Sequence, residues 1–65
     1  MVNIWEYYDS GKIQLTTTDG KVYIGYVVSV EDTEETYDPE DSITIYADGE
    51  YYGFLQSEIA EIEEL

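Results

Sequence analysis

Residues 12–30 read KIQLTTTDGKVYIGYVVSV, and the pattern within this stretch decides the fold. Apolar and polar side chains alternate through residues 13–17, which predicts a strand with one buried face. Asp19 and Gly20 follow, and an Asp-Gly pair between two alternating runs is a strong signal for a tight β-hairpin. Residues 22–30 then predict a long return strand, so the fold is built outward from one hairpin.

The return strand has two faces. One face carries Val22, Ile24, Tyr26, Val28 and Val30, and the other carries Tyr23, Gly25, Val27 and Ser29. We take the face with Ile24 as the inward one, and therefore expect Tyr23 on the outside. Gly25 within the strand predicts a bend or bulge, at which the strand passes from one sheet to the next.

Further elements lie on both sides of this hairpin. Residues 42–46 and 51–55 alternate as strands do and are joined by a second Asp-Gly turn. The segment 57–65 fits either a short helix or a turn through residues 57–59 followed by a closing strand, and its periodicity does not decide between them. Residues 3–10 predict a short helix, with Asn3 as the N-cap.

The length of 65 residues corresponds to one domain, residues 1–65, near the lower limit for a self-sufficient core. The chain has neither Cys nor His, which excludes disulfides and zinc sites built from those residues. Closing five short strands into a barrel removes exposed sheet edges. The prediction is an all-β, five-stranded small barrel with a short N-terminal helix, and Trp5 is expected to plug one end of it.

The segment IQLTTTDGKVYIGYVVSVED resembles the first signature of the Sm and Sm-like family of small barrels. Its matching positions are Asp19, Gly20, Gly25 and Asp32. The ending YYGFLQSEIAEIEEL is similar to the second signature, with Ile59 and Ile62 as paired aliphatic residues of the closing strand. Asp-Gly with a later Gly is also common in SH3-like barrels. The Sm resemblance implies RNA binding in a ring of six or seven subunits.

Two departures bear on the RNA site that the resemblance implies. The family reads a base with an Asn after the signature Asp, but residues 33–36 are Thr-Glu-Glu-Thr. Its Arg-Gly or Lys-Gly before the last strand is replaced by Gln56-Ser57. The expectation is an Sm-like fold without the family's RNA-contacting residues.

The charge balance restricts possible partners. Sixteen acidic residues face only Lys12 and Lys21, giving a formal net charge of -14. Direct nucleic-acid binding needs several cations on one face, and an anionic membrane is disfavoured for the same reason. We find no apolar run of membrane-spanning length and no signal-peptide pattern at the N-terminus, so a cytoplasmic protein is expected.

The segment 31–41, EDTEETYDPED, carries seven of these carboxylates. We expect it to be a solvated loop between the second and third strands. Calcium binding through an EF-hand loop fails, because Tyr37 stands where the sharp turn needs Gly. The prediction is no dedicated metal or cofactor site and at most weak divalent cation binding. The acidic loop residues are Glu31, Asp32, Glu34, Glu35, Asp38, Glu40 and Asp41.

Catalysis is not expected, because the usual base and thiol nucleophile, His and Cys, are absent and so short a chain offers little room for a cleft. The eight tyrosines instead indicate an interaction surface, since Tyr gives a large contact area at a small entropic cost. The candidate surface residues are Tyr23, Tyr46, Tyr51, Tyr52 and Phe54.

The predicted function is a non-catalytic, acidic protein-binding or assembly module whose partner is another protein or a second copy. One alternative is a nucleic-acid-mimicking inhibitor of a nucleic-acid-binding protein. A weaker alternative is a residual RNA-binding role.

Overall fold

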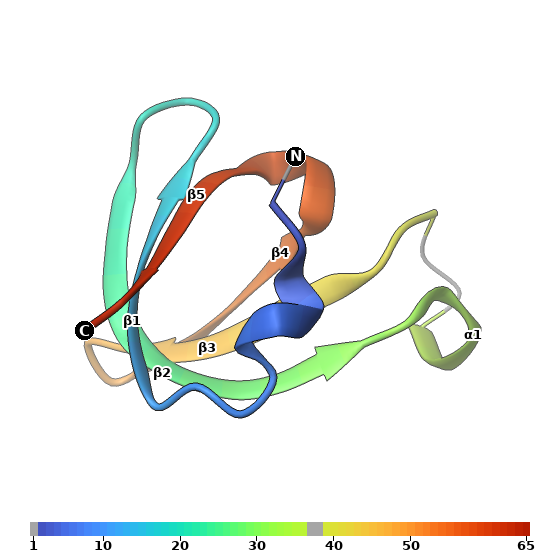
Figure 1. Cartoon of the computed structure of the whole chain (residues 1–65), viewed down its shortest axis with the longest axis horizontal. Helices are drawn as coiled ribbons and strands as arrows, with labels where there is room; N and C mark the ends of the chain where they lie inside the picture. Colours follow the sequence, from blue (N-terminus) through green and yellow to red (C-terminus); the bar gives the residue numbers. More distant parts are fainter. Residues whose placement is uncertain (1, 37–38) are drawn as a thin grey trace.

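Five antiparallel strands form one sheet in the order β4-β3-β2-β1-β5 in this computed structural model (Figure 1). The structure describes residues 2–36 and 39–65, and the side chains of residues 35 and 36 are outside that description. The elements in chain order are η1 (Ile4–Tyr7), β1 (Lys12–Thr17), β2 (Val22–Glu31), α1 (Thr33–Thr36), β3 (Ser42–Ala47), β4 (Glu50–Leu55), η2 (Gln56–Glu58) and β5 (Ile59–Glu64). The all-β prediction is confirmed, and α1 and the two 3-10 helices are each about one turn long.

The β1–β2 hairpin turns through three residues, 18–20, with Gly20 at a φ of +90°. This loop places Tyr23 opposite Leu15 and Ile24 opposite Gln14. Directly paired residues share a face of the sheet, so Tyr23 joins the buried Leu15 on the inside and Ile24 is 47% exposed. The expectation that Ile24 faces inward and Tyr23 outward is therefore wrong. A two-residue loop would have shifted the pairing by one and reversed both side chains.

The side chain of Thr17 holds this three-residue loop. Its hydroxyl accepts a hydrogen bond from the Lys21 amide at 3.1 Å and donates one to the Asp19 carboxylate. The Gly20 amide donates to the Thr17 carbonyl at 3.0 Å. Thr17 is buried, and these bonds satisfy its hydroxyl. One residue therefore both packs in the core and holds the turn.

Strand β2 belongs to two ladders. Residues 22–26 pair with β1 and residues 26–31 pair with β3, and Figure 1 shows β2 curving between them. A register shift between Val27 and Ser29 reverses the facing of the strand, which brings Val30 opposite the buried Ile43. The bulge thus lies beyond Gly25. At Gly25 itself, an added Cβ would lie 2.3 Å from the Tyr46 carbonyl oxygen, so this glycine permits a close approach of β3.

The second Asp-Gly pair forms a two-residue turn between β3 and β4. Ala47 pairs with Glu50, and both Asp48 and Gly49 have positive φ, 53° and 80°. Two positive φ values are typical of the type I′ turn that suits a right-twisted hairpin. Both predicted Asp-Gly hairpins are confirmed, although their loops differ in length.

The core is built from side chains of η1 and all five strands, and all of them are aliphatic except Phe54. Its buried residues are Ile4, Ile13, Leu15, Val30, Ile43, Ile45, Ala47, Phe54, Ile59 and Ile62. Asn3 caps η1 by accepting a hydrogen bond from the Trp5 amide, and the turn that follows directs Ile4 into the core. Trp5 is 40% exposed, so the expectation that it plugs a barrel end is wrong. Its indole N–H instead donates a hydrogen bond to Asp41 at the surface. A ring buried in the core would have lost this partner for its N–H group.

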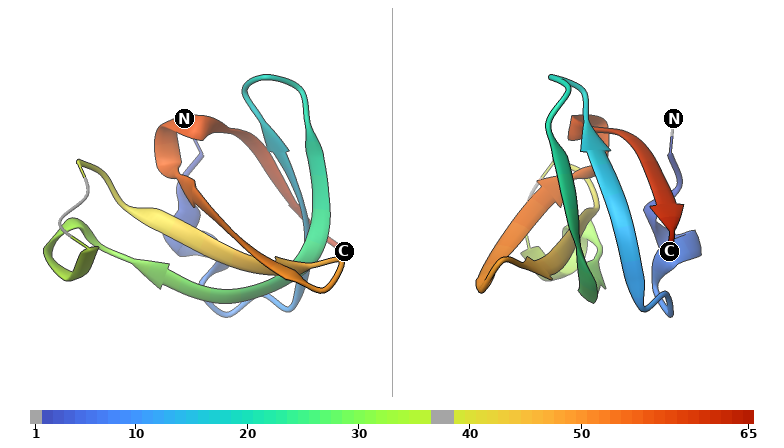
Figure 2. Two further views of the ribbon diagram at one scale, coloured as in Figure 1. Left: turned by 180° about the vertical axis from the view of Figure 1, so that it is seen from behind. Right: turned by 90° about the vertical axis from the view of Figure 1, so that its left-hand side faces the viewer.

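The sheet does not close into a barrel, which corrects the predicted closure. In the described residues β4 pairs only with β3 and β5 only with β1, so these strands form the two edges (Figure 2). The chain between them turns through η2, which interrupts any ladder, and the exposed Glu61 and Glu63 on β5 oppose pairing at that edge. The C-terminal segment is the turn-plus-strand alternative rather than a helix, with Ile59 and Ile62 buried.

Replacing Gly25 with Ala tests the close approach of β2 and β3. We expect Gly25→Ala to lower the free energy of unfolding by about 2 kcal/mol or more, because the new methyl group collides with backbone. Gly53→Ala in β4 is the matched control. Its added Cβ meets nothing closer than 3.9 Å, so its effect should stay within about 1 kcal/mol. Urea denaturation followed by circular dichroism measures both, and equal effects would contradict the assignment.

Candidate functional site

An exposed apolar surface crosses three neighbouring strands on the outside of the sheet. Tyr26 on β2 is paired with Tyr46 on β3, which is paired with Tyr51 on β4. The Tyr46 and Tyr51 rings pack edge to face with centroids 5.0 Å apart, and Tyr51 is 70% exposed. We call this surface the outer tyrosine face, and its residues are Val22, Ile24, Tyr26, Tyr46 and Tyr51.

Carboxylates border the outer tyrosine face at two ends. Gln14 on β1 pairs with both Ile24 and Glu63, so Glu63 lies two strands from Ile24 in the same row. Glu61 is related to Val22 in the same way through Thr16. At the other end, Asp48 belongs to the β3–β4 turn that precedes Tyr51, whereas Glu50 pairs with the buried Ala47 and lies on the inner side. Lys12, the partner of Tyr26, is the cation in these rows, so the border is predominantly anionic.

The five predicted surface residues do not form one surface. Tyr46 and Tyr51 are exposed as predicted. Tyr23 and Tyr52 are half-buried and Phe54 is buried, and all three point to the inner side of the sheet. The exposed Val22, Ile24 and Tyr26 were missed. Only the length of the hairpin loop, which sets the register, could have revealed them.

Tyr23, Tyr52 and Phe54 form an inner aromatic cluster. The Tyr23 ring lies 5.0 Å from both other rings, measured between centroids. The Tyr52 hydroxyl donates a hydrogen bond of 2.9 Å to the Glu50 carboxylate. This bond, together with partial desolvation and the negative charge nearby, raises the pKa of Tyr52 above its ordinary value of 10.0, because they favour the neutral hydroxyl.

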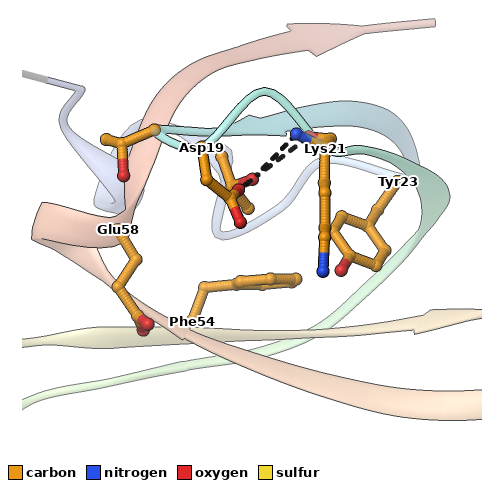
Figure 3. Close-up of a pocket in the computed structure, with 7 residues that line it drawn as sticks. Asp19, Lys21, Tyr23, Phe54 and Glu58 are labelled. Carbon is orange, nitrogen blue, oxygen red and sulfur yellow. Dashed lines mark hydrogen bonds between the residues drawn. The ribbon is translucent and has the colours of Figure 1, made fainter.

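A cleft of about 290 Å³ opens beside this cluster, between the β1–β2 turn and η2 (Figure 3). Tyr23 and Phe54 contribute ring surface, and Lys21 extends alongside Tyr23. Each carboxylate in the cleft already has a local structural partner. Glu58 accepts the Leu55 amide at 2.7 Å, and Asp19 accepts the Thr17 hydroxyl, which lowers the pKa of Asp19. The two carboxylates of the cleft thus serve to hold turns.

The end of the acidic loop is held by hydrogen bonds, whereas the sequence predicts a solvated loop throughout. Glu40 accepts hydrogen bonds from both the amide and the hydroxyl of Ser57, each 2.6 Å long. Asp41 accepts the Trp5 indole N–H at 2.8 Å, and its carbonyl accepts the Gln56 amide at 3.0 Å. Two acids of the loop therefore join η1, β3 and η2.

The remaining acids of this segment have different positions. Glu31 ends β2, Asp32 follows it, and Glu34 is exposed on α1. Asp38 and the side chain of Glu35 lie outside the described residues. Among the residues described, no group of three or more Asp, Glu, His or Cys side chains is placed to hold a metal ion.

Comparison with protein-family models, curated proteins and solved structures finds no match to this chain. No enzyme family or enzyme homologue is found, and nothing points to catalysis. In the described part of the chain, every helix is too short to cross a bilayer. The candidate site is therefore defined by the geometry of its own residues.

Substitution distinguishes the contribution of Glu40 to stability from that of the other acids. We expect Glu40→Gln to lower the free energy of unfolding by about 1 kcal/mol, because the charge-assisted bonds to Ser57 are weakened. Glu34→Gln removes the same charge from an exposed position and should be neutral or slightly stabilising, within about 0.5 kcal/mol. Thermal and urea melts compare the two variants. An equal change in the free energy of unfolding would show that Glu40 does not anchor η2.

The Tyr52–Glu50 bond predicts a pH dependence. The folded-state pKa of Tyr52 is raised, so its contribution to stability is fully present below pH 10.0 and is lost as the pH rises through the folded pKa. Glu50→Gln should move that pKa down toward 10.0, whereas Glu63→Gln on β5 should leave it unchanged. Carbon-13 NMR titration of the Tyr52 ring provides the measurement. An unchanged pKa in Glu50→Gln would rule out the bond.

Proposed function

We propose that this chain is a non-catalytic protein-binding module that docks a positively charged protein on its outer tyrosine face. The observation that carries this proposal is the exposure of five apolar and aromatic side chains on three adjacent strands. Such contiguous patches are unusual on monomeric proteins and mark contact surfaces. Tyrosine is also among the residues that contribute most to interface energy.

Charge indicates the chemistry of the partner. The formal net charge is -14, and Glu61, Glu63 and Asp48 border the face. A partner with an apolar centre surrounded by Lys and Arg complements this arrangement and is attracted over a longer range than contact. A second copy of the chain has the same charge, so self-association on this face is opposed by repulsion.

We further propose that the strands are organised as in SH3-like and Sm-like small barrels. Support comes from the strand order β4-β3-β2-β1-β5, from η2 between the last two strands and from η1 before the first. Of the two sheet edges in the described residues, β4 is the one open to assembly, because Glu61 and Glu63 oppose pairing at β5. The residual RNA role has less support, since a border of carboxylates repels phosphates.

The nucleic-acid-mimic alternative is favoured by a separate feature. Glu61 and Glu63 are exposed and alternate along β5, which spaces their side chains about 7 Å apart along one edge of the sheet. A mimic would bind its target through such carboxylates, and the aromatic residues of the outer tyrosine face would be dispensable. This difference allows one experiment to distinguish the two functions.

The experiment compares three immobilised baits in quantitative capture from a cell extract at low salt. The baits are the native chain, the face variant Tyr46→Ser/Tyr51→Ser and the edge variant Glu61→Gln/Glu63→Gln. We expect a basic protein that the native chain retains and that the face variant retains at least about ten-fold less, as for loss of interface tyrosines. Purified partner and calorimetry then confirm a direct contact.

Other outcomes separate the alternatives. If the edge variant alone loses the captured protein, and double-stranded DNA competes for it, the mimic is the correct function. Light scattering over a dilution series tests self-association, and a native dimer that the face variant abolishes would replace the basic partner with a second copy. If the face variant retains everything that the native chain retains, the proposal is wrong.

A further inference from the structure

A second concave surface, separate from the cleft of Figure 3, lies between η1 and the end of β2. It has a volume of about 790 Å³, within the range of ligand-binding pockets. We call it the tryptophan groove, and its lining residues are Trp5, Tyr8, Asp9, Val28, Ser29, Val30 and Glu31. None of the described residues that line it is cationic.

Aromatic rings form one wall of the tryptophan groove. Trp5 and Tyr8 stack with an interplanar angle of 23° and centroids 6.3 Å apart. Tyr8 is 57% exposed and Val28 on the facing strand is also exposed, so ring and aliphatic surface are open to a ligand. Two carboxylates, those of Asp9 and Glu31, lie in the same lining.

The wall is held in place before any ligand arrives. The Trp5 indole N–H is bonded to Asp41 at 2.8 Å, and the Trp5 amide is bonded to the Asn3 side chain at 3.1 Å. Glu31 accepts a hydrogen bond of 3.1 Å from the Ser29 hydroxyl. Groups that are ordered in advance lose less entropy on binding, which favours recognition of a single side chain.

We propose that the tryptophan groove binds an arginine side chain of a protein partner. A guanidinium is planar, stacks on aromatic rings and donates hydrogen bonds in a fork that matches carboxylates, and the groove offers both kinds of contact. Lysine, with a compact and strongly hydrated charge, uses the rings less well. The proposal rests on the proposed function, because it specifies one contact that a basic partner makes.

The chain contains one tryptophan, so Trp5 reports directly on this groove. The probe is the blocked peptide acetyl-Gly-Arg-Gly-Arg-amide, titrated into the full chain while Trp5 fluorescence is recorded. We expect a saturable change, with amide NMR shifts confined to η1 and the end of β2. The peptide with citrulline in place of arginine should give no change, because it keeps the shape without the charge.

Charge-matched variants locate the binding. Asp9→Asn/Glu31→Gln should weaken binding of the arginine peptide about ten-fold, as for the loss of two partly exposed charge contacts. Glu61→Gln/Glu63→Gln removes the same charge from β5 and should weaken it less than about two-fold. Equal weakening by the two variants would show general attraction to an acidic protein. It would overturn the proposal that the peptide binds in the groove.

Two further results bear on the proposal. A lysine peptide should bind several-fold more weakly than the arginine peptide, and equal affinity would overturn the stacking on Trp5 and Tyr8. Tyr46→Ser/Tyr51→Ser should bind the arginine peptide as the native chain does. Failure of the groove is thus distinct from failure of the proposed function, which is tested on the outer tyrosine face.

Discussion

The three-residue turn between β1 and β2 sets the register on which the rest of the structure depends. Thr17 holds this turn by bonding to both Asp19 and the Lys21 amide. Because side chains alternate along a strand, one extra loop residue decides which set of alternate side chains of β2 faces the core. The inner aromatic cluster and the outer tyrosine face are two results of that single choice, one on each side of the sheet.

Negative charge is the second constraint, and it works differently at different positions. Most of the sixteen acids add to a net charge of -14 that opposes compaction. Glu40 and Asp41, in contrast, join segments distant in sequence through hydrogen bonds to Ser57 and Trp5. Similar side chains thus destabilise the fold by repulsion and stabilise it by bonding, according to whether an N–H or O–H group lies within reach.

Much of the fold could be predicted because local signals agreed with one another. Alternation and the two Asp-Gly pairs located both hairpins, and Asn3 located the start of η1. The facing of β2 could not be predicted, because Asp-Gly fits both two- and three-residue loops and both faces of the strand are apolar or aromatic. The position of Trp5 depended on Asp41, thirty-six residues away, and no local pattern encodes such a bond. The candidate surface was accordingly found at Tyr46 and Tyr51 and missed at Tyr26.

The open sheet gives dissolved salt two effects on this molecule. Counterions shorten the reach of charge to about 8 Å at physiological ionic strength, which relieves repulsion within the chain and favours the native state. The same screening weakens the repulsion by which Glu61 and Glu63 keep β5 from pairing with strands of other molecules. Concentrated brine should therefore raise the melting temperature and also make it depend on protein concentration, since association adds to the stability of the folded form.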